Sequence, residues 1–331
     1  MITIKENMMR LFTGEMPEFL PRYRLMVNAR PAILAGDRNP DMSGTDIFGV
    51  KFVNVPGTGP IQEPGFMLFD DIRKWRDYIK VPDFSDVDWE AMAKKVNDGW
   101  DPDQAHGVGT SMGFFQAMYN FMGFTDALIA CAEEPDEILA LMEYLTDFYV
   151  ANAKNAVKYY NADYGTIGDD IAHARSPFVS LDMFRTLFRP FWQRYIDVFK
   201  ELDMPVILHN CGNNDILIDD FVEMGINAWE PAEEVNDIIA IKKRHGRKLA
   251  ICGAFRQNGI ASYADSGEEE VKGEVSRVIE AYGPGGGYAF CGIILGAADD
   301  ADINQRNQWI LEECDRYANM GSKFYEDRPF N

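Results

Sequence analysis

The sequence predicts an α/β fold, and specifically a (β/α)8 TIM barrel with an N-terminal helical extension. From about residue 160 onward, short apolar runs typical of buried strands alternate with longer amphipathic runs typical of helices. This order is the one expected of parallel strands joined by helical crossovers. The chain of 331 residues also has a suitable length for a single barrel domain, although the same length would fit two smaller domains.

The predicted strand and helix pairs follow one another along the second half of the chain. Several of the helical runs are closed by a glycine, as expected of helix ends. Pro190 is expected to kink or split the first helix. The pairs are DYGTIGDD (163–170) with LDMFRTLFRPFWQRYIDVFKEL (181–202), MPVILHNCG (204–212) with NDILIDDFVEMG (214–225), INAWE (226–230) with EEVNDIIAIKKRHG (233–246), KLAICGAF (248–255) with GEEEVKGEVSRVIEAYG (267–283), and GYAFCGII (287–294) with INQRNQWILEECDRYANM (303–320).

The first half of the chain shows fewer regular patterns. Residues 30–66 are broken by glycine and proline, and GVGTSMGFFQAMYNFMGF (107–124) is typical of a further strand-to-helix passage. We therefore expect one domain over residues 1–331, with a helical and irregular extension at 1–70 and the barrel at 71–331. Helical patterns before the barrel are ENMMRLFTG (6–14), FDDIRKWRDYI (69–79) and DWEAMAKKVNDGW (88–100).

Composition excludes several classes of partner. The chain has 53 acidic and 32 basic residues, for a formal net charge of −21, which disfavours nucleic acid as a partner. No apolar run reaches about 18 residues, so we expect no membrane partner. The N-terminal segment mixes charges with apolar residues and lacks a signal-peptide core, which predicts a cytoplasmic location. The five cysteines are scattered along the chain, as is typical of free thiols or metal ligands.

Glycine-rich motifs do not indicate a nucleotide site. No Gly-x-Gly-x-x-Gly follows an early strand, which disfavours a dinucleotide-binding sheet. GPGGGY (283–288) comes after a helix and before a strand. A phosphate-binding loop needs the reverse order, because the amides at a helix N-terminus must face the anion. We interpret this stretch as a turn.

The strongest chemical signal is a His-x-Cys pair at the end of an apolar run. His209 and Cys211 are two residues apart on a predicted strand, so their side chains point to the same side, with Asn210 turned away. They also lie at the carboxyl end of that strand, where barrel enzymes place their catalytic residues. Zinc accepts both imidazole and thiolate, and a catalytic zinc needs a third protein ligand. Cys252 and Cys291 are both candidates, and a role as buried core thiols stays open for each.

Four segments resemble a known family: the uroporphyrinogen decarboxylase superfamily, in particular its zinc-dependent corrinoid methyltransferase branch, which includes the coenzyme M methyltransferases. The resemblance implies that His209, Cys211 and Cys291 are the zinc ligands and that Cys252 is not. The segments are KENMMRLFTGEMPEFLP (5–21), GDDIAHARSPFVSLDMFRTLFRPFWQRYIDVFKE (168–201), PVILHNCGNNDILIDDFVEMGINAWEP (205–231) and GGYAFCGIILGAADDADINQRN (286–307).

Two departures from the family's motifs change the activity that we expect of this chain. The decarboxylases proper carry an arginine-rich N-terminal motif that binds the acidic side chains of their tetrapyrrole. This chain has Arg22, Arg24 and Arg30 in that region but not the motif, which disfavours tetrapyrrole decarboxylation. Where many relatives have Gly-Gly-Ile-Asp after a late strand, this chain has CGAFR (252–256). A role for the aspartate of that motif is therefore not expected here.

The resemblance implies a zinc-dependent methyltransferase. It would move a methyl group between a small methylated substrate and the cobalt of a corrinoid, such as methylcobalamin, carried by a separate corrinoid-binding protein. This chain has no Asp-x-His-x-x-Gly motif of the kind that binds cobalt. O-demethylation of an aryl methyl ether, as in relatives from anaerobic bacteria, is the favoured reaction. The alternatives are methyl transfer from a methylcorrinoid to a coenzyme M-like thiol, corrinoid binding without turnover, and a metal-free decarboxylase or tetrapyrrole-binding protein.

Further candidate residues follow the predicted strands. Asp169 and Asp170 end one strand and face opposite ways, so one of them is expected to face the site, as a hydrogen-bond partner of His209 or as an acid for the leaving group. A role as helix cap or exposed loop acid stays open for both. Glu230 ends the strand that follows the His209 strand, and the same roles are open to it. The candidate substrate-binding residues are His173, Arg175, Trp229, Arg256 and Phe114.

Overall fold

The computed structural model describes residues 2–23, 28–55, 59–109, 113–297 and 299–328. Its centre is a parallel sheet of seven strands in the order β1-β6-β7-β8-β9-β10-β11. These strands are β1 (Asn28–Ala29), β6 (Gly107–Gly109), β7 (Tyr164–Gly168), β8 (Val206–His209), β9 (Ala228–Ala232), β10 (Ala250–Ala254) and β11 (Tyr288–Cys291).

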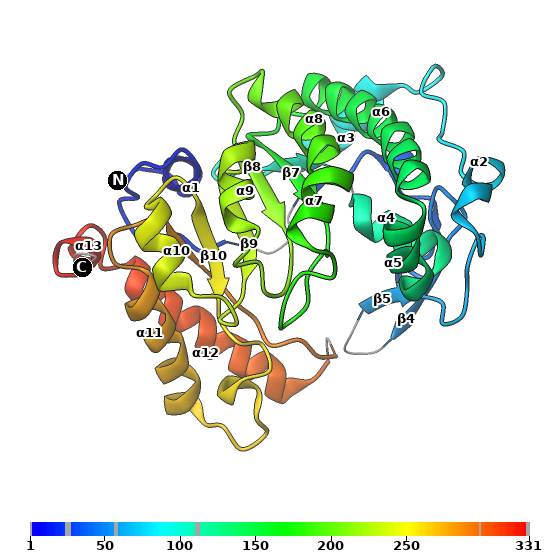
Figure 1. The fold of residues 1–331 in the computed structure, drawn as a ribbon. Coiled ribbons are helices and arrows are strands. Elements are labelled where there is room, and N and C mark those ends of the chain that lie inside the picture. The colour runs from blue at the N-terminus through cyan, green and yellow to red at the C-terminus, as the bar shows by residue number, and fades with distance from the viewer. Residues whose placement is uncertain (1, 24–27, 56–58, 110–112, 298, 329–331) are drawn as a thin grey trace.

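The sheet closes on itself. The Tyr23 N–H donates to the carbonyl of Phe290 (2.8 Å), and the Phe290 N–H donates to the carbonyl of Pro21 (3.0 Å). The chain just before β1 therefore pairs with β11, while β1 pairs with β6. A parallel sheet closed in this way, with helices outside it, confirms the predicted TIM-barrel fold (Figure 1).

Helices cover the outside of the barrel (Figure 1). The predicted effect of Pro190 is confirmed, because one helix ends at Leu187 and the next begins at Arg189, with the proline in its first turn. None of the helices in the described part of the chain is both long and apolar enough to cross a membrane. The helices are α1 (Ile4–Phe12), α2 (Trp75–Tyr78), α3 (Trp89–Asn97), α4 (Phe114–Met122), α5 (Phe124–Glu133), α6 (Pro135–Tyr159), α7 (Leu181–Leu187), α8 (Arg189–Lys200), α9 (Ile218–Met224), α10 (Ile238–His245), α11 (Glu268–Tyr282), α12 (Ala301–Ala318) and α13 (Lys323–Glu326), with 3-10 turns η1 (Ala32–Leu34), η2 (Ile72–Lys74) and η3 (Ile260–Ser262).

The N-terminal extension differs from the prediction. Its helix α1 is present and packs Phe12 against the rings of Tyr23 and Tyr164 inside the barrel. The stretch that follows forms a four-stranded antiparallel sheet rather than helix or irregular chain: β2 (Asp37–Arg38), β3 (Gly44–Thr45), β4 (Lys51–Val55) and β5 (Gly59–Gln62). In addition, β1 belongs to the barrel sheet, so the barrel begins before residue 71.

The hydrophobic pattern of the sequence could not predict this antiparallel sheet. The strands β2 and β3 have two residues each and are joined by tight turns, so their hydrophobic pattern is too short to indicate a strand. Gly36 has φ +69°, and a Cβ there would lie 2.4 Å from the carbonyl oxygen of Thr45.

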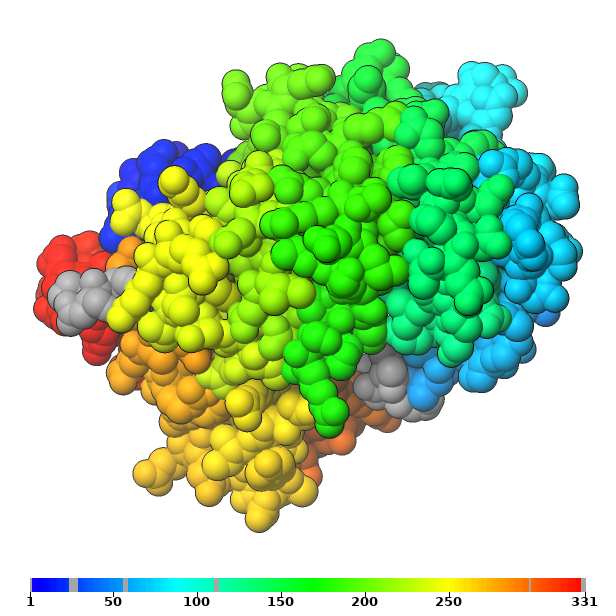
Figure 2. Space-filling view, in the orientation of Figure 1, coloured from blue at the N-terminus to red at the C-terminus, as the bar shows by residue number. Residues whose placement is uncertain are grey.

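In Figure 1, β4 and β5 lie near the end of the barrel toward which the arrows of β8 and β10 point. In Figure 2, the light blue surface of the chain around β5 and α2 lies against the green surface of the α4–α6 region.

Candidate metal centre at the barrel mouth

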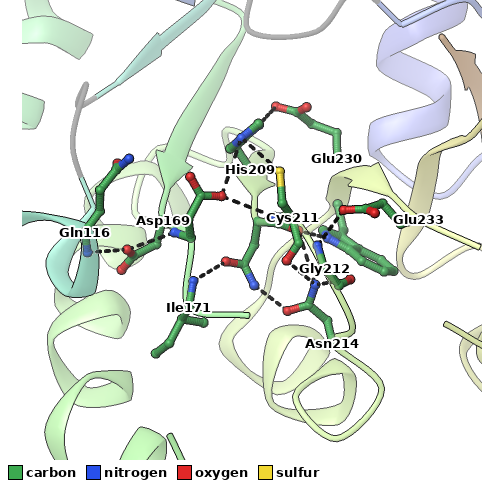
Figure 3. Close-up of polar contacts among 12 residues, drawn as sticks. Gln116, Asp169, Ile171, His209, Cys211, Gly212, Asn214, Glu230 and Glu233 are labelled. Atoms are coloured by element: carbon green, nitrogen blue, oxygen red, sulfur yellow. Dashed lines mark hydrogen bonds and ion pairs between the residues drawn. The ribbon is translucent and has the colours of Figure 1, made fainter. Parts of the chain in front are cut away.

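Three side chains converge at the carboxyl ends of β7 and β8. The Sγ of Cys211 lies 3.8 Å from Nε2 of His209, and Oδ1 of Asp170 lies 3.9 Å from the same nitrogen. Ligand atoms of all three residues lie within 4.8 Å of one another. The i and i+2 positions of His209 and Cys211 do bring their side chains together (Figure 3). Nitrogen, sulfur and carboxylate oxygen form a donor set that suits zinc.

Glu230 fixes the orientation of the histidine. Its Oε1 lies 3.1 Å from Nδ1 of His209, so Nε2 is left to face Cys211 and Asp170 (Figure 3). The Glu230 side chain is buried, and its Oε2 has no hydrogen-bond partner among the described residues. Burial disfavours the imidazolium, but the hydrogen bonds with Cys211 and Glu230 raise the pKa of His209 above its ordinary value. A carboxylate behind a metal-binding histidine is a common arrangement in zinc sites.

The residue between the two ligands points away from the centre. Asn210 is fully buried, and its Oδ1 accepts the N–H of Ile171 at 3.0 Å while its Nδ2 donates to Oδ1 of Asn214. Its carbonyl accepts the indole N–H of Trp229 at 2.8 Å. These bonds hold the loop after β8 against the end of β7.

Gly212 completes this loop. It has φ +84°, and a Cβ there would lie 2.8 Å from backbone atoms of Ala172 and His173. Its N–H donates to Oε1 of Glu233 at 2.6 Å. In the sequence Asn-Cys-Gly, Asn210 holds the loop by buried hydrogen bonds and Cys211 turns its thiol toward His209. Gly212 makes a sharp turn that only glycine makes without strain.

The structure separates the roles of the two adjacent aspartates. Asp169 is buried and accepts the N–H groups of Phe114 and Phe115 at Oδ2 and of Gln116 at Oδ1, each at 2.9 Å. It therefore caps the N-terminus of α4, although burial raises its pKa to about 6. Asp170 is the one that faces His209, as the alternation along a strand requires.

Cys291 is not brought into the cluster. It ends β11 with its side chain buried in the barrel interior, beside the alanines that fill this space and near Cys252. Among the described residues the cluster of possible ligand atoms contains Asp170, whereas the family resemblance implies Cys291. Cys252 is fully buried, and burial raises its pKa well above that of a free thiol. As the side chains stand, the carboxylate of Asp170 is the third group that lies close to His209 and Cys211.

The five candidate substrate-binding residues lie outside the cavity at the barrel mouth. Trp229 and Phe114 are buried, the first bonded to Asn210 and the second packed edge-on against Tyr149. Arg256 is an exposed residue paired with Glu234. His173 stacks on Phe178 at 5.0 Å, and Arg175 is exposed nearby. Short-range sequence position cannot tell which loop side chains turn inward, and none of these five lines the cavity.

A cavity of about 500 Å³ opens onto the cluster. It is bounded on one side by strand ends of the barrel and on the other by the antiparallel sheet and η1. The second wall could not be predicted from the sequence, because glycine and proline interrupt residues 30–66 and leave no regular pattern there. The lining residues are Arg30, Leu34, Ala35, Arg38, Met42, Asp46, Ile47, Phe48, Phe52, Pro60, Gln116, Asn120, Tyr149, Thr166, Ile167, Gly168, Asp169, Asp170, His209 and Glu230.

Comparisons with known proteins agree with this fold. Residues 45–297 match the sequence profile of uroporphyrinogen decarboxylase (URO-D). The solved structure of a methyltransferase from Methanosarcina mazei is similar over 96% of this chain and 99% of its own, with a TM-score of 0.66 and 14% identity. A Xaa-Pro dipeptidase with bound methionine in the active site matches 68% of this chain and 57% of its own at 12% identity, with a TM-score of 0.32 that supports no inference. No curated protein matches the sequence.

Proposed function

The chain belongs to the uroporphyrinogen decarboxylase family, and we propose that it is a zinc-dependent methyltransferase. The favoured reaction is O-demethylation of a small aryl methyl ether, with the cobalt of a corrinoid on a separate protein as the methyl acceptor. The observation that carries the proposal is the cluster of Asp170, His209 and Cys211 at the mouth of the barrel, open to a cavity. The name of the Methanosarcina mazei neighbour, a methyltransferase, supports the same chemistry.

We propose that His209, Cys211 and Asp170 hold the zinc ion. Three protein ligands leave one position for substrate, as in catalytic zinc sites. When bound, the zinc supplies Lewis acidity that makes an ether oxygen a better leaving group. Cys291 is the ligand that the sequence resemblance implies, and a metal measurement on variants separates it from Asp170.

Side chains around the proposed zinc site orient its ligands and shape the cavity beside it. With a metal on Nε2 of His209, the Nδ1–H of the neutral ring would donate to Glu230, which holds the ring in this tautomer. Burial raises the pKa of Cys211, and His209 opposes this effect, so thiolate formation is coupled to the histidine. The antiparallel sheet forms a wall of the cavity that limits water around the reacting group.

Metal content of the purified protein tests this proposal. We expect about one zinc per chain in the wild type, and loss of zinc in Asp170→Ala and Cys211→Ala, because each removes one of three ligands. Cys131→Ala, which removes a buried thiol on α5 far from the cluster in sequence, is the matched control and should keep its zinc. Zinc loss in Cys291→Ala with full zinc in Asp170→Ala would return the third ligand to Cys291. Absence of zinc after supplementation would refute the proposed function.

A further inference from the structure

Two loops are bound to each other behind the metal centre: residues 210–217, which follow β8, and residues 233–237, which follow β9. We propose that Asn236, in the second loop, is a positioning residue that sets the place of the Cys211 thiol from behind. This inference rests on the proposed function, because it takes Cys211 and His209 as metal ligands. Asn236 does not line the cavity, so its role is to hold a ligand and not to contact the substrate.

The two ligands from the β8 segment stand near the separation that a zinc site requires. A tetrahedral zinc site places its sulfur and nitrogen ligand atoms about 3.6 Å apart, from bond lengths of about 2.3 and 2.05 Å. In the structure, Sγ of Cys211 and Nε2 of His209 are 3.8 Å apart. Ligands held near their final positions lose little freedom when a metal binds, so the groups that hold them contribute to affinity.

The two ligands are held in different ways. His209 is the last residue of β8, and its Nδ1 lies 3.1 Å from Oε1 of Glu230 on β9. Cys211 lies beyond the end of β8, where the strand ladder no longer fixes the chain. Side chains make the bonds that join its loop to the loop after β9, including the bond from the Gly212 N–H to Oε1 of Glu233 at 2.6 Å. The position of the thiol therefore depends on these side chains.

Asn236 binds two peptide groups that follow the cysteine. Its Oδ1 accepts the N–H of Asn214 at 2.6 Å, and its Nδ2 donates to the carbonyl of Gly212 at 2.9 Å. The same Nδ2 donates to the carbonyl of Glu233 at 2.8 Å, which anchors the side chain in its own loop. Asn236 is buried, so water does not compete for these bonds. Together they fix the direction in which the chain leaves Cys211.

Asn214 extends this hold to the cysteine itself. Its Nδ2 donates to the carbonyls of Asn210, Cys211 and Gly212, at 3.2, 3.2 and 3.1 Å. Asn214 is fully buried. One side-chain amide therefore gathers three successive carbonyls behind the loop, while the thiol of the middle residue points toward the metal centre (Figure 3). Because Asn236 binds the N–H of Asn214, it holds the residue that makes these bonds.

Loss of the Asn236 side chain would release the loop on one side only. The buried N–H of Asn214 would lose this acceptor, and the carbonyl of Gly212 would lose one of its donors. Buried polar groups without partners are costly, so the loop would shift toward other partners. The shift would move Cys211 but not His209, which stays in the strand. The distance between the two ligands would then change.

Zinc affinity of the full-length protein, measured by competition with a chelator, tests this role. We expect Asn236→Ala to bind zinc about 10- to 100-fold more weakly than the wild type, as is typical when a residue that orients a ligand is lost. The substitution leaves every proposed zinc ligand in the chain, so weaker binding would come from their placement.

Asn7→Ala is the matched control. Asn7 is also a buried asparagine, and its Nδ2 donates to the carbonyl of Phe19 at 2.9 Å while its Oδ1 accepts the N–H of Glu18 at 2.7 Å. It lies on α1, whose Lys5 pairs with Asp163 just before β7 and so at the opposite end of the barrel from the metal centre. This control should lose stability as Asn236→Ala does, but bind zinc as the wild type does.

Two further readouts separate positioning from a general loss of stability. In protein loaded with cobalt(II), the charge-transfer band of the cobalt–thiolate bond should weaken or shift in Asn236→Ala and stay unchanged in Asn7→Ala. In metal-free protein, Cys211 is half-buried and the other cysteines are buried, so a thiol reagent reports on Cys211. We expect faster reaction in Asn236→Ala, because a released loop exposes the thiol, and the wild-type rate in Asn7→Ala.

Glu233→Ala covers the case in which Asn236→Ala does not fold. It removes the acceptor of the Gly212 N–H, whereas Glu233→Gln keeps an acceptor and removes only the charge. We expect Glu233→Ala to bind zinc about ten-fold more weakly than Glu233→Gln. Equal zinc affinity of these two variants, or equal zinc affinity and thiol reactivity of Asn236→Ala and Asn7→Ala, would overturn the inference. A wild type that binds no zinc would refute the proposed function, and the thiol reaction would still test whether Asn236 places Cys211.

Discussion

Replacing Asn210 by alanine tests whether the loop that carries the metal ligands is held from behind. The substitution removes two buried hydrogen bonds, leaving the Ile171 N–H and the Asn214 Oδ1 without these partners. Each orphaned buried group costs about 1–3 kcal/mol, so for the two groups we expect the free energy of unfolding to fall by about 2–6 kcal/mol. Because the loop also places Cys211, zinc affinity should fall by about 10- to 100-fold.

Urea denaturation followed by circular dichroism measures the first effect, as a lower midpoint with an unchanged slope. Competition with a chelator measures the second. Asn213→Ala is the matched control: it lies in the same loop, and its side chain bonds at the surface to the carbonyl of Val235. We expect this control to lose less than about 1 kcal/mol. Equal stability of Asn210→Ala and Asn213→Ala would show that the buried Asn210 side chain does not hold the loop.

Three further changes have expected outcomes. Burial lowers the pKa of Lys242 to about 7; the unfolded chain then binds more protons than the native state between about pH 7 and 10, so stability should rise with pH by up to about 5 kcal/mol. Lys242→Met should abolish that rise in urea titrations, and equal pH slopes would contradict the assignment. Gly212→Ala should lower the Tm, because its Cβ meets backbone at 2.8 Å; an unchanged Tm would show that the loop relaxes freely. Glu230→Gln should weaken zinc binding by about 10- to 100-fold with little change in Tm, and wild-type zinc affinity would exclude the orienting role.

The barrel could be predicted from the sequence because its units repeat. From β7 to β11, each apolar strand is followed by an amphipathic helix, and this periodicity depends only on local residues. His209 and Cys211 could be placed together for the same reason, since i and i+2 side chains of a strand share a side. The alternation also required that Asp169 and Asp170 face opposite ways, but only the structure shows that Asp169 caps α4.

The cavity wall could not be predicted, because it depends on contacts between segments distant in the sequence. Arg38 and Asp46 are brought to the barrel mouth by very short strands with glycine turns, which leave no periodic pattern. Asp170, and not Cys291, lies with His209 and Cys211 in the structure, and this placement depends on how strands distant in the sequence come together. Trp229 has the chemistry of a pocket residue, yet its indole N–H is bound to a carbonyl behind the loop.

Methyl transfer itself is the most direct test of the proposed zinc-dependent methyltransferase activity. The zinc-loaded protein is mixed with methoxylated aromatic acids and free cob(I)alamin, and formation of methylcobalamin is followed by its absorption spectrum. We expect methylcobalamin to form with the wild type and not with Cys211→Ala. A second reaction, between methylcobalamin and thiols, tests whether the same site transfers a methyl group from cobalt to a thiol. No transfer in either direction by the zinc-loaded wild type, or equal rates in Cys211→Ala, would contradict a zinc-dependent methyltransferase.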